Sequence, residues 1–208
     1  MPALDVDHVI DVLDRLEEHP IAVTPELCTR KRHRLSTCSR CFDACPAGAI
    51  TWEDGLQIAW DACTGCGICA AVCPTGALEA KKPTNDELLV EIQRVLRGQD
   101  DIVFACPLVQ VEGRAQPVRV GCLGRLDESL LVSAIVHGAQ SVWLVDSACE
   151  GCPQALGRAL AGKAAARSNA LLGAFGHPGR IAFRRDIPEE GNVRVDSSGV
   201  SRRGLLKV

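Results

Sequence analysis

The feature that most constrains this chain is a cysteine pattern that occurs twice in its N-terminal half. The two copies stand 28 positions apart and consist of Cys38, Cys41, Cys45 and of Cys66, Cys69, Cys73. The residues that follow each copy repeat as well, as Pro-Ala-Gly-Ala-Ile at 46–50 and Pro-Thr-Gly-Ala-Leu at 74–78. A duplication of this kind indicates two copies of one supersecondary unit related by a pseudo-twofold axis.

The second copy carries a complete ligand run for iron–sulfur clusters. The run reads Cys63-x2-Cys66-x2-Cys69-x3-Cys73-Pro74. Three thiolates on one tight loop reach three irons of a cube, and the fourth cysteine of such a run ligates the neighbouring cluster. Gly65 and Gly67 let backbone N–H groups approach the inorganic sulfides. Paired cysteines also suit zinc, but the two-residue gaps, the Cys-Pro ending and the duplication favour clusters.

The first copy departs from the pattern, because Leu35 stands where its first ligand is expected. Three explanations are open. Cys28 supplies the ligand across an insertion, or the site holds a three-iron cluster, or His33 ligates as a nitrogen donor. We expect Cys28, the one unassigned cysteine of this half. The crossed pattern then gives cluster one the ligands Cys28, Cys38, Cys41 and Cys73, and cluster two the ligands Cys45, Cys63, Cys66 and Cys69.

The insertion implied by this assignment is strongly basic. It reads Thr-Arg-Lys-Arg-His-Arg at 29–34. Such a run is either a solvated loop, a docking patch for an acidic partner, or a counter-charge that raises the potential of the nearby cluster.

Residues 38–78 resemble the two-cluster bacterial ferredoxins. The resemblance implies an α+β ferredoxin-like domain that holds two 4Fe-4S clusters close enough for fast electron tunnelling.

Beyond residue 84 the pattern changes to strands that alternate with helices. We expect strands at 101–105, 117–121 and 141–145, and helices at 85–97, 129–137 and 153–174. This alternation indicates a small α/β domain with a parallel, doubly wound sheet.

The four remaining cysteines follow these strands. They are Cys106, Cys122, Cys149 and Cys152. Because the carboxyl ends of parallel strands share one edge, we expect the four thiols to converge there. Buried structural cysteines and a redox pair formed by Cys149 and Cys152 are the alternatives, although a pair leaves Cys106 and Cys122 unexplained.

The second half resembles the delta subunit of methyl-viologen-reducing hydrogenases. The resemblance rests on Val-Gly-Cys-Leu-Gly-Arg-Leu-Asp at 120–127, His-Gly-Ala at 137–139, Val142, Val145 and Cys-Glu-Gly-Cys at 149–152. It implies a third cluster, 2Fe-2S, on Cys106, Cys122, Cys149 and Cys152. It also implies electron transfer between a hydrogenase or dehydrogenase and a heterodisulfide-reductase-like flavoprotein. Cys152 is followed by Pro153 and not by a His, which departs from the pattern of that family. The nuclearity of the third cluster is therefore left open.

Composition narrows the classes of partner and the compartment. Aromatic residues make up 3%, Tyr is absent and the formal net charge is -3, which argues against nucleic-acid binding. Residues 4–18 predict a short acidic amphipathic helix without the features of a secretory signal. No stretch approaches the roughly 18 apolar residues of a membrane span. We therefore expect a cytoplasmic protein with reduced, ligating thiolates and no membrane span.

The expected organisation has four parts. They are an N-terminal helix at 1–27, a two-cluster ferredoxin domain at 28–82, a hydrogenase-delta-like α/β domain at 84–176 and an irregular tail at 177–208. The twin-arginine-like run at 201–207 is interpreted as a coincidental helix start, since that motif is normally read at an N-terminus.

These features predict an iron–sulfur electron-transfer subunit that is not itself catalytic. It relays single electrons between a low-potential acceptor and a partner oxidoreductase, which is a hydrogenase, a formate or NAD(P)H dehydrogenase, or a heterodisulfide-reductase-like flavoprotein. Two alternatives remain. One is an enzyme with a substrate or an open-coordination cluster in the α/β crevice, near His137, Asp146 and Glu150. The other is a zinc-binding interaction module.

Overall fold

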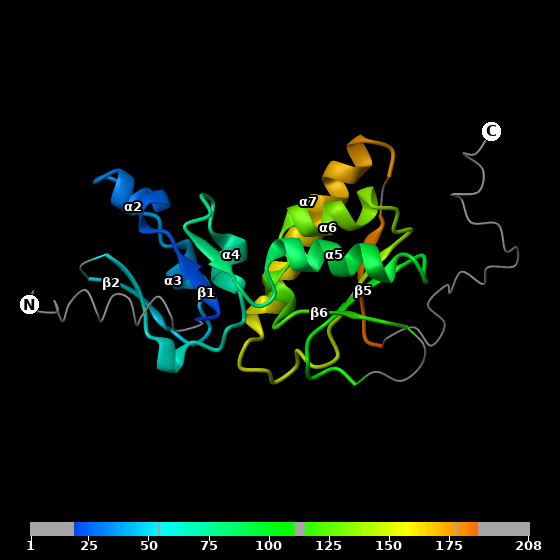
Figure 1. The fold of residues 1–208 in the computed structure, drawn as a ribbon, viewed down its shortest axis with the longest axis horizontal. Helices are drawn as coiled ribbons and strands as arrows, with labels where there is room; N and C mark the ends of the chain where they lie inside the picture. Colours follow the sequence, from blue (N-terminus) through cyan, green and yellow to red (C-terminus); the bar gives the residue numbers. More distant parts are fainter. Residues whose placement is uncertain (1–18, 54, 111–114, 178, 187–208) are drawn as a thin grey trace, which may run out of the picture.

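The chain folds into two units that lie side by side along its longest axis (Figure 1). The computed structural model describes residues 19–53, 55–110, 115–177 and 179–186. The helix expected at 4–18 and the run at 201–207 lie outside the described residues. Among the helices of the described ranges, none has the length and apolar character that crossing a membrane requires.

The first unit contains one succession of elements twice. The first copy consists of β1 (Ile21–Val23), the 3₁₀ turn η1 (Pro25–Leu27), α2 (Thr29–Arg32), α3 (Arg40–Ala44) and β2 (Ile50–Trp52). The second copy consists of β3 (Leu56–Ile58), η2 (Trp60–Ala62), α4 (Ile68–Val72) and β4 (Leu78–Ala80). α3 and β2 precede α4 and β4 by 28 residues, whereas β1 and η1 precede β3 and η2 by 35 residues. The first copy therefore contains seven additional residues, and α2 lies in this added stretch.

The strands of the two copies pair with each other. β1 is antiparallel to β4, with Ile21 opposite Ala80, and β2 is antiparallel to β3. The expected boundary at residue 28 is thereby corrected, because β1 belongs to the ferredoxin-like unit. The two-residue periodicity of a short sequence such as Ile-Ala-Val is too weak to indicate this pairing, which depends on a partner strand far along the chain.

The second unit is built on a parallel sheet with the strand order β6–β5–β7–β8. Its elements are α5 (Asn85–Val95), β5 (Ile102–Ala105), β6 (Val118–Arg119), η3 (Leu123–Arg125), α6 (Glu128–Val136), β7 (Val142–Val145), α7 (Leu156–Ala174) and β8 (Ile181–Arg184). The starts of α5 and α6 are capped by side chains. Thr84 and Glu87 form a reciprocal capping box at α5, and Asp127 Oδ1 accepts the N–H of Leu130 at α6 (2.9 Å).

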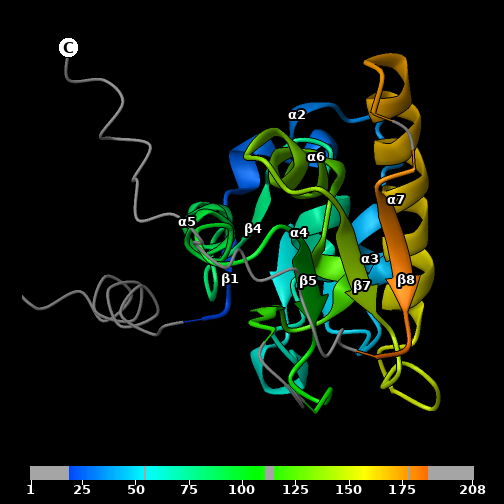
Figure 2. The ribbon, with the colours of Figure 1, turned by 90° about the vertical axis from the view of Figure 1, so that its right-hand side faces the viewer.

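The sheet of this unit is parallel, as expected. It is not doubly wound, because its helices pack on one face of the sheet. One core joins apolar side chains of α5, α6 and α7 to Ile102, Phe104, Val142 and Leu144. The opposite face, with Val103 and Val145, packs against described loop residues such as Val109 and Ala115. Figure 2 shows the sheet beside α7, with α5 and α6 in the same unit.

The tail expected to be irregular from residue 177 contains the edge strand β8. It pairs in parallel with β7, with Ile181 opposite Val142. The side chain of Asn169 on α7 binds both backbone groups of Ile181, donating to its carbonyl (2.8 Å) and accepting from its N–H (3.1 Å). The sheet therefore continues past the expected boundary at residue 176.

Candidate functional site

Four cysteines of the first unit line one cavity, called here the cluster-one cavity. It holds about 340 Å³ of empty space, including open solvent, and its cysteines are Cys28, Cys38, Cys41 and Cys73. His33 is exposed, and its Nδ1 accepts the N–H of Leu35 (3.3 Å). The side chain of Leu35 is 68% exposed. Of the two candidate replacement ligands, Cys28 and His33, Cys28 lines the cavity.

Cys28 reaches this cavity because it is the structural counterpart of Cys63. Each cysteine ends a 3₁₀ turn in an extended conformation, with φ −67° and ψ 127° for Cys28 and φ −72° and ψ 118° for Cys63. The N–H of Cys28 binds the carbonyl of Pro25 (2.9 Å), and that of Cys63 binds the carbonyl of Trp60 (3.1 Å). Counting the repeat backward by 28 residues misses this equivalence, because the added residues come after Cys28. A comparison at an offset of 35 residues would have found it.

The backbone around Cys73 favours a thiolate. Burial raises the pKa of the Cys73 thiol, but hydrogen bonds from the N–H groups of Thr75, Leu78 and Ala77 and from the Thr75 hydroxyl outweigh burial, and the net pKa is lowered. N–H groups directed at a sulfur stabilise its charged form. The Pro-Thr-Gly-Ala-Leu repeat thus supplies donors to a ligand sulfur, as expected of a cluster loop.

The other four cysteines of the first unit line a second cavity, the cluster-two cavity. It holds about 350 Å³ of empty space, including open solvent, and its cysteines are Cys45, Cys63, Cys66 and Cys69. Burial above all raises the pKa of the Cys69 thiol to about 12, and the charges of the other three thiols act in the same direction. The N–H of Ala49 donates to the sulfur of Cys45 (3.3 Å). Four thiols here stand near enough to influence one another and surround a mainly apolar space.

Both cavities fit a group of several atoms. Within the described ranges, no three His, Cys, Asp or Glu side chains are arranged to hold one metal ion. The eight thiols instead stand around two enclosed spaces, four to each. Four cysteine sulfurs around one space are the donor set of a 4Fe-4S cube, whose irons each take one thiolate. The residues present therefore fit iron–sulfur clusters.

The remaining cysteines gather at the carboxyl edge of the sheet and are called here the third cysteine group. Cys106 follows β5 directly, Cys122 precedes η3 just after β6, and Cys149 and Cys152 lie in the turn after β7. Burial raises the pKa of the Cys149 thiol, with further contributions from Cys106, Asp146 and Cys152. Burial also raises the pKa of the Cys122 thiol to about 11, with smaller contributions from Cys66, Cys149 and Cys152. Electrostatic influences thus connect Cys149 with Cys106 and Cys152, and Cys122 with Cys149 and Cys152.

The third cysteine group lies against the ligand loop of the cluster-two cavity. A Cβ on Gly121 would lie 3.4 Å from the carbonyl oxygen of Gly65 and 3.6 Å from the Cα of Cys66. Ala44, Ile68 and Cys122 form a buried core shared by the two units, with Cys66 packed on it. The side chain of Gln154 donates to the hydroxyl of Thr64 (3.0 Å). Cys122 of the third cysteine group is therefore a neighbour of the loop that carries Cys66 of the cluster-two cavity.

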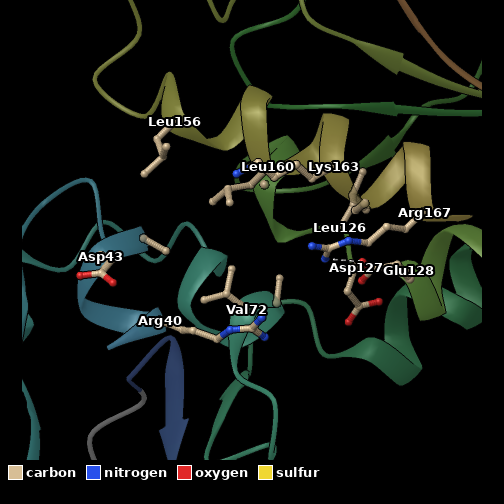
Figure 3. Close-up of a pocket in the computed structure, with 14 residues that line it drawn as sticks. Arg40, Asp43, Val72, Leu126, Asp127, Glu128, Leu156, Leu160, Lys163 and Arg167 are labelled. Carbon is tan, nitrogen blue, oxygen red and sulfur yellow. Dashed lines mark hydrogen bonds and ion pairs between the residues drawn. The ribbon is translucent and has the colours of Figure 1, made fainter. Parts of the chain in front are cut away.

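A groove without cysteines runs beside this contact, between α3 and α4 of the first unit and α7 of the second (Figure 3). It holds about 1050 Å³ of empty space, including open solvent. Its walls carry Val72, Leu126 and Leu160, and its rim carries charged side chains of both signs, among them Arg167, which pairs with Glu128 (3.0 Å).

The polar residues considered for a catalytic crevice do not act together. Asp146 is buried and pairs with Arg158 (2.6 Å). Glu150 is 84% exposed, near Arg185 (3.6 Å). The Nδ1 atom of His137 lies 2.7 Å from the carbonyl of Ser133 at the exposed end of α6. Each of these three side chains has its own local partner.

The basic segment after Cys28 is partly structural. The guanidinium of Arg30 lies over the rings of Phe42 and Trp52, 5.5 and 5.0 Å from their centroids, within the range of a cation–π contact. The exposed Lys31 pairs with Glu26 (2.8 Å), and residues 32–34 are exposed. α2 thus forms a basic surface next to a cysteine of the cluster-one cavity.

Comparison with known families agrees with this division. A family model for a 4Fe-4S dicluster domain matches residues 34–77, and one for the methyl-viologen-reducing hydrogenase delta subunit matches residues 105–195. The chain is 40% identical over 55 residues to an uncharacterized ferredoxin of Methanocaldococcus jannaschii, a match that spans 24% of this chain and 71% of that protein.

Two further relatives are named as parts of a pyruvate synthase and of a hydrogenase. Pyruvate synthase subunit PorD of Thermotoga maritima is 43% identical over 55 residues, which cover 26% of this chain and 56% of that subunit. Hydrogenase-4 component A of Escherichia coli is 32% identical over 88 residues, which cover 39% of this chain and 43% of that protein. The chain thus spans less than two thirds of the length of these two relatives. The chain belongs to the ferredoxins through its first unit, and residues 105–195 match the model of the methyl-viologen-reducing hydrogenase delta subunit.

Proposed function

We propose that this chain is an iron–sulfur electron-transfer subunit with three cluster sites in line. Two 4Fe-4S clusters would be held by the cysteines of the cluster-one and cluster-two cavities, and a 2Fe-2S cluster by the third cysteine group. Bound clusters supply one-electron redox chemistry. The protein contributes the thiolates, the N–H groups that stabilise them and the burial that limits solvent access.

The contact between Cys122 and the loop of Cys66 carries this proposal. Cys66 is a ligand candidate for cluster two, and Cys122 belongs to the third cysteine group. Electron transfer needs redox centres that are close together, and this contact brings the two ligand sets together. The cluster-two site therefore lies between the other two sites, and the cluster-one site at the opposite end carries the basic surface of α2.

We infer that the partners are redox proteins at the two ends of this line. The delta subunit family gives one partner class, a hydrogenase or dehydrogenase together with a heterodisulfide-reductase-like flavoprotein. The relatives named as subunits of hydrogenase and pyruvate synthase support a role inside such a complex. Exposed Lys31, Arg32 and Arg34 favour an acidic partner at the cluster-one end.

Metal analysis and EPR of protein purified without oxygen test this assignment. We expect about eight to ten irons per chain with matching acid-labile sulfide, and interacting 4Fe-4S signals after reduction. Zinc without acid-labile sulfide would contradict the proposal.

The Cys122→Ser variant tests the third site by itself. It should lose one cluster signal and about two irons, while both 4Fe-4S signals remain. Cys45→Ser is the matched control, since it should alter a 4Fe-4S signal and leave the third signal in place. Equal spectra for Cys122→Ser and the unmodified protein would exclude a cluster on the third cysteine group.

A further inference from the structure

The contact between the two units contains a buried arginine that the electron-transfer proposal does not use. Arg125 is the last residue of η3, three positions after Cys122, and its residue surface is 3% exposed. Charged side chains are almost never fully buried unless they are paired. A buried guanidinium at this place calls for a charge partner.

Arg125 lies directly against the loop that carries the cluster-two cysteines. A Cβ on Gly67 would stand 2.2 Å from the Cδ of Arg125 and 3.0 Å from its Nε, distances that a real side chain cannot occupy. Gly67 lies between Cys66 and Cys69 and lines the cluster-two cavity. A glycine at this position, with φ +76°, therefore lets the arginine side chain cross the ligand loop at van der Waals distance.

The protein offers this guanidinium few partners. Its Nη2 donates to the amide oxygen of Asn85, and among the described residues its Nε has no hydrogen-bond acceptor. The carboxylate of Asp127, two residues away, is occupied with the hydroxyl of Ser129 (2.7 Å) and the N–H of Leu130 (2.9 Å). A buried charge with one neutral partner is costly, so its presence indicates a further negative charge nearby.

Thiolates that hold a cluster in the cluster-two cavity would supply such a charge in addition to the carboxylate of Asp127. Burial lowers the pKa of Arg125, whereas the charges of Asp127 and Cys69 raise it. Arginine does not lose its proton in proteins, so the positive charge persists. Arg125 therefore lies against Gly67 of the cluster-two ligand loop, near enough for the charge of Cys69 to influence its pKa.

We propose that Arg125 is a positioning residue for the cluster-two site, whose fixed positive charge raises the reduction potential of the cluster bound there. The inference rests on the proposed function. One-electron reduction adds an electron and no proton, so the site becomes more negative by one charge. A nearby positive charge stabilises the reduced state more than the oxidised one. The second unit would thus set the potential of a cluster held by the first.

The test is an EPR-monitored redox titration of the intact, cluster-loaded chain. Arg125→Gln removes the charge and keeps a polar side chain, so the midpoint potential of one 4Fe-4S cluster should shift to a more negative value. The other 4Fe-4S cluster should keep its potential. Arg125→Lys should restore most of the shift. Arg167→Gln is the control, because it removes an arginine at the groove rim whose side chain is 67% exposed. It should leave both potentials unchanged.

A second variant covers the case in which Arg125→Gln does not fold. Asn85→Asp keeps the Arg125 side chain and places a carboxylate beside its guanidinium, at the first position of α5, where a negative charge is tolerated. This near-isosteric change should also lower the potential of the same cluster. A purely structural role predicts lower thermal stability for Arg125→Gln with unchanged potentials in every variant. That result would overturn the inference and leave the proposed function standing, whereas the absence of 4Fe-4S signals in the unmodified chain would overturn both.

Discussion

The two units of this protein both gather cysteines, but they place them differently with respect to their cores. In the first unit the buried apolar core is small, and four partly buried cysteines pack against it together with the buried Cys69. In the second unit a large core of side chains from three helices and the sheet forms without the ligand candidates, apart from Cys149 at its margin. The thiols of that unit stand at the rim of the sheet.

Because of this difference, we expect folding and cluster binding to be coupled in the first unit and independent of each other in the second. Short strands of three residues and helices of four or five form too few hydrogen bonds to be stable by themselves. We therefore expect the stability of the first unit to depend on the clusters proposed to bind its cysteines. The second unit has a core sufficient for its own fold.

The largest expected effect follows from removing iron. Chelation of the protein under oxidising conditions should unfold the first unit and leave the second folded, because binding energy at such sites is folding energy. Hydrogen exchange should show lost protection in β1–β4 and retained protection in β5, β7 and α7. Retained protection in β1–β4 of the iron-free chain would mean that the first unit does not need its clusters.

A single ligand change should affect one site within the first unit. Cys28→Ser removes a cysteine of the cluster-one cavity and should convert or abolish one 4Fe-4S signal, while the cluster-two and third signals persist. Iron content should fall by about one to four atoms per chain. EPR after reduction and after mild oxidation distinguishes a three-iron product from complete loss.

The cysteine at position 28 and a cysteine at position 35 are not expected to be interchangeable. Leu35 is 68% exposed, so Leu35→Cys combined with Cys28→Ser should not recover the lost signal. Leu35→Ser serves as the control and should have the spectrum of the unmodified protein. Recovery by Leu35→Cys would instead place the first ligand where the 28-residue spacing predicts it.

The sequence predicted most where structure depends on neighbours along the chain. The repeat, the helices of the second unit and its central strands follow from local spacing and periodicity. It predicted less where a strand depends on a partner far along the chain. β1 pairs with β4, and β8 is bound by Asn169 of α7. Cys28 was the expected ligand, but its equivalence to Cys63 was not visible at a spacing of 28 residues, because the first copy of the repeat contains seven additional residues. The burial of Arg125 has no sequence signal, because arginine is mostly exposed.

A smaller effect, confined to the second unit, is expected from the first turn of α7. A Cβ on Gly157 would lie 2.3 Å from the sulfur of Cys122, so Gly157→Ala must displace that thiol. The third signal should be lost or altered, with both 4Fe-4S signals unchanged. Gly162→Ala on the same helix is the matched control. Its Cβ would make an ordinary contact with Phe183 (3.7 Å), and the helix should gain about 0.5–1 kcal/mol.

The smallest effect concerns the start of the edge strand β8, where Asn169 binds Ile181. Asn169→Ala removes the acceptor and the donor that bind Ile181, which leaves two backbone groups without partners at a cost of about 1–3 kcal/mol. Hydrogen exchange should accelerate in β8, and the unfolding free energy of the second unit should fall, while all cluster signals stay unchanged. Lys163→Ala, at an exposed position of the same helix, should change neither. β8 borders β7, whose carboxyl end leads to Cys149. A changed third signal in Asn169→Ala would therefore show that the third cysteine group depends on the edge strand. That result would contradict the separation of folding and cluster binding expected for the second unit.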